Sequence, residues 1–163
     1  MTANEVIAAV LERDVQMVQW TLGDFSDADL LVRPAPNANH GAWQLGHLIV
    51  AEQHAGNAVK PGSMPELPAG FADRFSKEKA KSDNPADFPT RAELLAQFER
   101  VRRGTVAWAR AMTQQDYGAP TPEKMQGWAP TVGQLAIALS GHVAMHLGQF
   151  QVVRRKLGKP VLF

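Results

Sequence analysis

Residues 132–157 of the chain, VGQLAIALSGHVAMHLGQFQVVRRKL, decide the fold. Thr131 stands where a helix N-cap is expected, because its hydroxyl can accept a free backbone N–H. Residues 154–156 are basic and would lie in the last turn, where cations suit the negative end of the helix dipole. Gly158 follows as a C-terminal stop, and Pro160 cannot continue a helix. The stretch therefore predicts one long helix from about 132 to 157.

Three other stretches repeat apolar residues at steps of three and four, the period of an amphipathic helix. No run of alternating β-branched residues predicts a strand. Together with the last helix, this pattern predicts an all-α fold, a four-helix bundle. The three stretches run from about 3 to 25, from about 40 to 59 and from about 91 to 112.

Two connections between the predicted helices are rich in proline and glycine. Residues 60–90 form a long connection between helices two and three, and residues 113–130 form a second loop. We expect Asn39 to cap the second helix, and Thr90 and Glu93 to form a capping box at the start of the third. Long connections in a compact domain often carry function, so we expect both loops to form walls of a substrate pocket.

The size and charge of the chain exclude several classes of protein. At 163 residues it has the length of one domain, 1–163. Lys and Arg number 17 and Asp and Glu 16, so the net charge of +1 gives no general attraction to nucleic acid or anionic lipid. The absence of cysteine excludes disulfides, zinc fingers and a cysteine nucleophile. Without a signal-peptide pattern or an apolar run near ~20 residues, we expect a cytoplasmic protein with no membrane and no nucleic-acid partner.

His142 and His146 form the most informative pair of side chains. A step of four residues turns a helix by ~40° and rises ~6 Å, so both imidazoles leave one face, one above the other. Leu135, Leu139 and Val153 fall within roughly 60° of His142 on the helical wheel, which places the pair on the buried side. Buried ring nitrogens need partners. A shared metal ion or hydrogen bonds within the core would each satisfy them.

His47 on the predicted second helix is a third candidate ligand, because it shares an apolar side with Trp43. Three protein ligands with one open position are typical of a catalytic zinc site. His54 lies two turns further on, and we interpret it as a pocket-wall residue or a solvated residue at the helix end. His40 is expected to cap the helix or be exposed. Glu52 lies ~140° from His47 on the wheel and should not bind the same metal.

Asp14 and Gln149 are candidates for roles beside the metal. Asp14 falls near the middle of the apolar stripe of the first helix, where a carboxylate is costly unless it is paired. It could accept a hydrogen bond from a ligand histidine or act as a base near substrate; pairing with an arginine or with backbone donors is the alternative. Gln149 is one turn beyond His146 and could orient water or substrate, or be a surface amide.

The segments Ala42-Trp43-Gln44-Leu45-Gly46-His47-Leu48 and Ser140-Gly141-His142-Val143-Ala144-Met145-His146-Leu147-Gly148-Gln149 resemble the DinB/YfiT-like superfamily of bacterial four-helix bundles. The resemblance covers nearly the whole chain. It implies a divalent metal, most often zinc or nickel, held by His47, His142 and His146. Characterised branches include transferases that use low-molecular-weight thiols such as bacillithiol or mycothiol, and a mycothiol-dependent isomerase.

Three functions remain open from the sequence. The first is a metal-dependent enzyme that activates a low-molecular-weight thiol for S-transfer to an electrophilic small molecule; because the chain has no cysteine, the thiol must come from outside. The second is a metal-dependent hydrolase that uses water, for which Asp14 is the one inward candidate base. The third is a non-catalytic bundle with a structural metal.

We also expect a homodimer, which the superfamily resemblance implies as well. The last helix carries a strip of small residues at Gly141, Ala144 and Gly148, away from the histidine face. The second helix is apolar on the side opposite His47 and would need cover there. A molar mass from light scattering would test this expectation.

Overall fold

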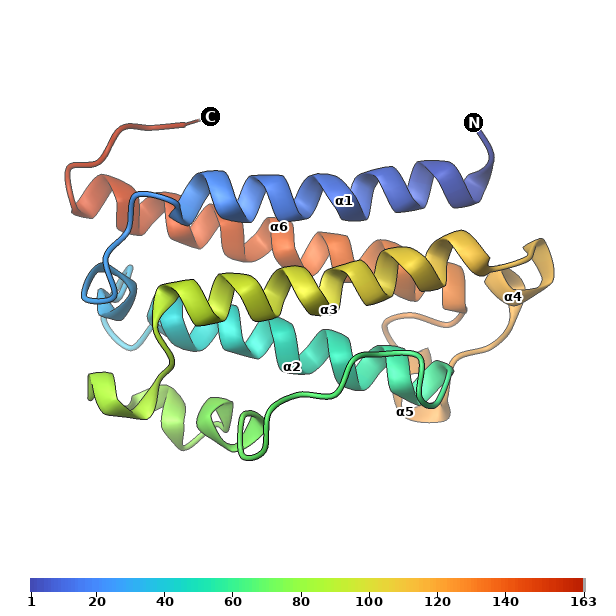
Figure 1. Ribbon diagram of the computed structural model, residues 1–163, viewed down its shortest axis with the longest axis horizontal. Helices are drawn as coiled ribbons and strands as arrows, with labels where there is room; N and C mark the ends of the chain where they lie inside the picture. The colour runs from blue at the N-terminus through green and yellow to red at the C-terminus, as the bar shows by residue number, and fades with distance from the viewer. Residues whose placement is uncertain (163) are drawn as a thin grey trace.

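The computed structural model describes residues 1–162, and its four longest helices lie side by side (Figure 1). α1 packs against α3 and α6, and α2 packs against the same two helices. Within residues 1–162 there is no β-strand, only an isolated bridge, and no helix is both long and apolar enough to cross a membrane. The all-α prediction is confirmed. The bounds are α1 Ala3–Leu22, α2 Gly41–Val59, α3 Arg91–Ala111 and α6 Val132–Lys156.

The predicted helix ends are correct at α3 and α6. Thr90 and Glu93 form the capping box of α3, and Thr131 forms one with Gln134 at α6. Gly158 takes a φ of 69°, the left-handed conformation expected of a C-terminal stop.

Two predicted helix ends are wrong. α1 ends at Leu22 rather than near residue 25, because Gly23 and Asp24 turn the chain; Phe25 still reaches the core and so extends the apolar pattern past the helix. The N-cap of α2 is His40 and not Asn39, so the expectation that His40 caps the helix is confirmed, while its alternative of an exposed ring is wrong because the ring is buried. Its Nδ1 accepts the Trp43 N–H at 3.2 Å, and its Nε2 donates to the Ser82 carbonyl at 3.0 Å. The contact with Ser82, far along the chain, fixes the ring at the helix start.

The long connection between α2 and α3 is ordered by aromatic side chains that pack on the core. Phe71, Phe75 and Phe88 are buried in the same apolar cluster as much of α2. A Cβ at Gly46 would lie 1.9 Å from the Phe75 ring, so a glycine is required where the connection meets α2. The connection contains short 3₁₀ turns at Ala72–Phe75, Lys79–Lys81 and Pro85–Asp87, and the loop before α6 contains α4 (Gln114–Gly118) and α5 (Glu123–Gln126).

Of the two surfaces that suggested a homodimer, one is buried within the chain and the other is exposed to solvent. Leu45, Leu48 and Ile49 of α2 are buried within the single chain, so this side of the helix needs no partner. Gly141, Ala144 and Gly148 of α6 are exposed, and large apolar residues on the same helix are exposed as well. The homodimer stays a prediction, and its support comes from α6 alone.

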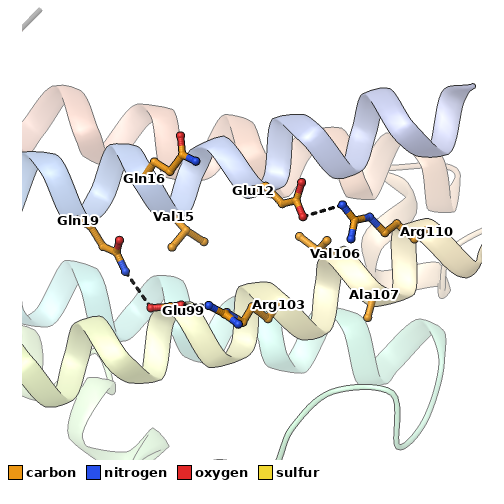
Figure 2. Close-up of a pocket in the computed structure, with 9 residues that line it drawn as sticks. All are labelled: Glu12, Val15, Gln16, Gln19, Glu99, Arg103, Val106, Ala107 and Arg110. Atoms are coloured by element: carbon orange, nitrogen blue, oxygen red, sulfur yellow. Dashed lines mark hydrogen bonds and ion pairs between the residues drawn. The ribbon is translucent and has the colours of Figure 1, made fainter. Parts of the chain in front are cut away.

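An open groove of about 630 Å³ runs between α1 and α3, and its rim is polar (Figure 2). Arg110 donates to Glu12 across the groove at 2.7 Å, and Gln19 donates to Glu99 at 2.8 Å. Polar pairs that are exposed to solvent contribute at most about 1 kcal/mol each to the free energy of unfolding. No histidine lines the groove.

A buried arginine joins all four long helices. The Arg102 guanidinium on α3 has no exposed surface, and it contacts Asp14 of α1 at 3.0 Å and Glu52 of α2 at 2.8 Å. It also donates to the Leu139 carbonyl of α6 at 3.4 Å. The sequence contained the signal for this residue, because Arg102 lies four residues after the buried Phe98 and so falls within the apolar stripe of α3.

We predict that Arg102→Met lowers the free energy of unfolding by about 3–5 kcal/mol, because it leaves two buried carboxylates without their cation. Urea unfolding followed by circular dichroism measures this change. Arg103→Met is the matched control: Arg103 is exposed and pairs with Glu99 on the surface, so its loss should be at most about 1 kcal/mol. Equal losses in the two variants would contradict the role given to Arg102.

Candidate metal centre

The three predicted ligand histidines meet between α2 and α6. One ring nitrogen each of His47, His142 and His146 lies within 4.8 Å of the other two, and within residues 1–162 this group includes no fourth metal-binding side chain. The Nε2 atoms of His142 and His146 are 3.2 Å apart. His146 is buried, while the other two rings are partly open to solvent. The structure thus brings together the residues that sequence spacing singled out.

The donor set fits a divalent ion. Two nitrogens bound to one tetrahedral ion at about 2.0–2.1 Å lie roughly 3.3 Å apart, close to the separation between His142 and His146. Imidazole nitrogen suits zinc and nickel, among other metals. The group could therefore hold a metal ion.

His146 is held in one tautomer by two glutamine side chains. Its Nδ1 lies 2.9 Å from Oε1 of Gln44 and 3.0 Å from Oε1 of Gln149, both of which can only accept, so the proton is on Nδ1. Its Nε2 then presents a lone pair toward His142. Gln44 is kept in place because its amide group donates to the Asn39 carbonyl. Such contacts orient ligand histidines and raise their basicity.

Gln44 is a site residue that the sequence reasoning missed. Its signal was its position three residues before His47, which puts both side chains on one face of α2. Gln149 was singled out, and the structure places its side chain on His146; its proposed action on water or substrate stays a prediction.

His47 is positioned by an aromatic neighbour. The Trp43 ring stacks on it with centroids 5.0 Å apart and an interplanar angle of 5°. Trp43 is fixed in turn, because its indole N–H donates to the Ser76 carbonyl of the long connection at 3.0 Å. The connection therefore helps to orient a candidate ligand.

The sequence model of the DinB superfamily matches residues 11–150, a span that includes all three histidines. The chain belongs to the DinB superfamily. A search of curated proteins gives no significant match. Family membership establishes the fold class, but it leaves the reaction open.

The remaining polar candidates of this DinB-superfamily chain lie outside the histidine group. Asp14 accepts hydrogen bonds from Arg102 and from the Ser140 hydroxyl at 3.2 Å, which is the arginine-paired alternative considered for it. Glu52 contacts Arg102 and lies outside the histidine group, and its position on the helical wheel predicted that it would not bind the same metal as His47. Burial raises the pKa of both carboxyls, and the Arg102 charge opposes this shift. His54 is exposed and lies outside the group of candidate ligands.

All three imidazoles of the group favour the neutral form that binds metal. Burial lowers the pKa of His47. Burial also lowers the pKa of His142, and the positive charges of His47 and Arg102 lower it further. For His146, burial followed by the two neighbouring histidines lowers the pKa to about 4, and the hydrogen bond with Gln149 opposes this shift. Neutral rings at pH 7 leave three lone pairs available for a cation.

A cavity of about 480 Å³ opens beside His142. His54 lies on its wall, as one reading of the sequence expected, and Met125 and Trp128 come from the loop before α6. The 113–130 loop therefore forms part of the pocket wall, as predicted. The 60–90 connection instead lines a neighbouring hollow that shares His54 with this cavity.

We predict that His146→Ala weakens zinc binding roughly a hundredfold or more, because one of three ligands is removed from the group. Competition with a chromogenic chelator measures the dissociation constant. His54→Ala is the control: it removes another imidazole from the neighbourhood and should change affinity by less than about twofold. Wild-type zinc affinity in His146→Ala, or an equal loss in His54→Ala, would contradict the assignment.

We predict that the metal-free protein loses stability as the pH falls from about 7 to about 5. An imidazole in the unfolded chain takes up a proton near pH 6.5, whereas His146 in the folded chain does so only at about 4. Between these values the unfolded chain binds more protons, so acid favours unfolding. With allowance for solvent screening, His146 accounts for about 1 kcal/mol of the loss at pH 5.

Urea unfolding at the two pH values measures this loss. His146→Gln is the comparison, because its amide does not titrate and the loss should be smaller by about that amount. If His146→Gln loses as much stability between pH 7 and pH 5 as the parent protein does, His146 is not the source of the pH dependence.

Proposed function

We propose that the chain binds zinc or nickel on His47, His142 and His146 and is a transferase that activates a low-molecular-weight thiol for S-transfer to an electrophilic small molecule. The proposal includes a cytoplasmic setting, where small thiols stay reduced. It is supported by superfamily membership, by the convergence of three neutral imidazoles, and above all by the cavity that reaches His142.

The cavity beside His142 is the observation that favours an open site over a structural one. Structural zinc sites are closed by four protein ligands, whereas catalytic sites keep a position for water or substrate. Within the described part of the chain the group has three ligands, and one of them lines a space large enough for a small molecule.

The chemistry follows from the charge of the donor set. A bound ion would lower the pKa of a thiol placed beside it and keep the sulfur as thiolate. Three neutral histidines add no negative charge, so an anionic and soft partner is favoured. The thiolate sulfur forms the new bond to the electrophilic carbon, the leaving group departs with its bonding electron pair, and the thiol proton passes to water.

The residues of the chain hold the reacting groups in place. Gln44 and Gln149 keep the proton of His146 on Nδ1, so that its Nε2 stays available. Trp43 covers one face of His47. Water as the nucleophile is the second candidate, but Asp14, the base that a hydrolase would use, is held by Arg102 and Ser140.

We predict thiol-dependent turnover in the zinc- or nickel-loaded protein. The measurement is thioether formation, followed by mass spectrometry, with a panel of small thiols and a halogenated dinitrobenzene as the electrophile. Chelation should abolish the rate above background, and His142→Ala should lower it roughly a hundredfold or more.

A hydrolase and a bundle with a structural metal predict different results for the same metal-loaded protein. Turnover of esters or amides without any thiol would support the hydrolase. Collapse of the fold on chelation, together with no turnover of any substrate, would show that the metal is structural and would overturn the proposal.

A further inference from the structure

The cavity beside His142 owes its space to small residues on two helices. Ala51 and Ala55 of α2 and Ala138 and Gly141 of α6 are among its lining residues. A Cβ at Gly141 would meet no atom within 4 Å, so the space continues up to the α6 backbone. The volume of about 480 Å³ is within the range of roughly 300–1,000 Å³ that is typical of small-molecule sites.

The larger lining residues are apolar and adaptable. Met125 and Met145 have flexible thioether side chains that adjust to ligands of different shape, and Trp128 offers an aromatic face. Trp128 is 55% exposed and Met145 is 55% exposed, so both have apolar surface that a ligand could cover.

The cavity has no carboxylate, ammonium or guanidinium group to pair with an ionic ligand. None of its lining residues is Asp, Glu, Lys or Arg, and its polar side chains are His54 and His142. Transfer of a charged group from water to an apolar wall without a partner is costly. An apolar compound, by contrast, gains about 25 cal/mol for each Å² that leaves water.

We infer that this cavity binds the electrophile and that the electrophile is an uncharged apolar compound with an aromatic or branched aliphatic body. The inference rests on the proposed function, because it assigns the second substrate of the same site. The polar end of the compound lies toward His142, and its body lies among Trp128, Met125 and Met145.

The test uses a matched pair of probes on the metal-free, full-length protein. N-phenylnaphthylamine is uncharged, and its sulfonated analogue, anilinonaphthalene sulfonate, has the same rings and one negative charge. Both gain fluorescence in apolar surroundings. We expect saturable binding of the uncharged probe, and binding of the sulfonate at least about tenfold weaker.

Two pairs of variants locate the binding site. Gly141→Phe fills the cavity, whereas Gly148→Phe adds the same ring at another exposed glycine of α6 whose Cβ would also meet nothing within 4 Å. Trp128→Ala removes an aromatic wall, and Trp20→Ala removes a tryptophan of similar exposure, 52%, from α1. Gly141→Phe and Trp128→Ala should each weaken the uncharged probe about tenfold, and the two controls should change it by less than about twofold.

The outcomes separate this inference from the proposed function. Absence of saturable binding, equal affinity for the sulfonate, or equal effects of Gly141→Phe and Gly148→Phe in folded variants would overturn the apolar assignment. Localised binding of the uncharged probe without thiol turnover would support the apolar cavity and overturn the transferase. Thiol turnover that accepts charged and uncharged electrophiles equally would support the transferase and overturn the inference.

Discussion

The buried guanidinium of Arg102 is the interaction on which the arrangement of the helices depends. It contacts one residue on each of the other three long helices, including the Leu139 carbonyl one turn before His142. Replacing a buried ion cluster with apolar residues often costs nothing, but removing one partner alone is expensive. Arg102 joins Glu52 of α2 to the Leu139 carbonyl of α6, so the two helices that carry the candidate ligands share one buried cation.

A second constraint comes from the connection between α2 and α3. Its Phe75 ring lies against Gly46, the residue next to His47, and its Ser76 carbonyl receives the indole N–H of Trp43. Ser82 of the same connection receives the N–H of His40 at the helix start. The segment thus holds the first two turns of α2, and with them one of three candidate ligands.

Local rules explain what the sequence could predict. The caps at Thr90 and Thr131 depend on neighbours three residues away, and the inward position of His142 and His146 follows from helical spacing. Contacts between distant segments explain the rest. Gln44 reaches His146 from another helix, and the contact of His40 with the Ser82 carbonyl joins the start of α2 to the long connection. Helical spacing alone placed Asp14 in the core but could not identify its partner.

The proposed function requires that His47, His142 and His146 bind one divalent ion. Zinc-edge X-ray absorption of the stoichiometric zinc protein tests it most directly, because imidazole rings give a recognisable outer-shell signal. We expect three imidazoles with nitrogen at about 2.0–2.1 Å from the ion, and two in a zinc-loaded His146→Gln variant. Fewer than three imidazoles in the parent protein, or the same number in parent and variant, would show that the three histidines do not share one ion.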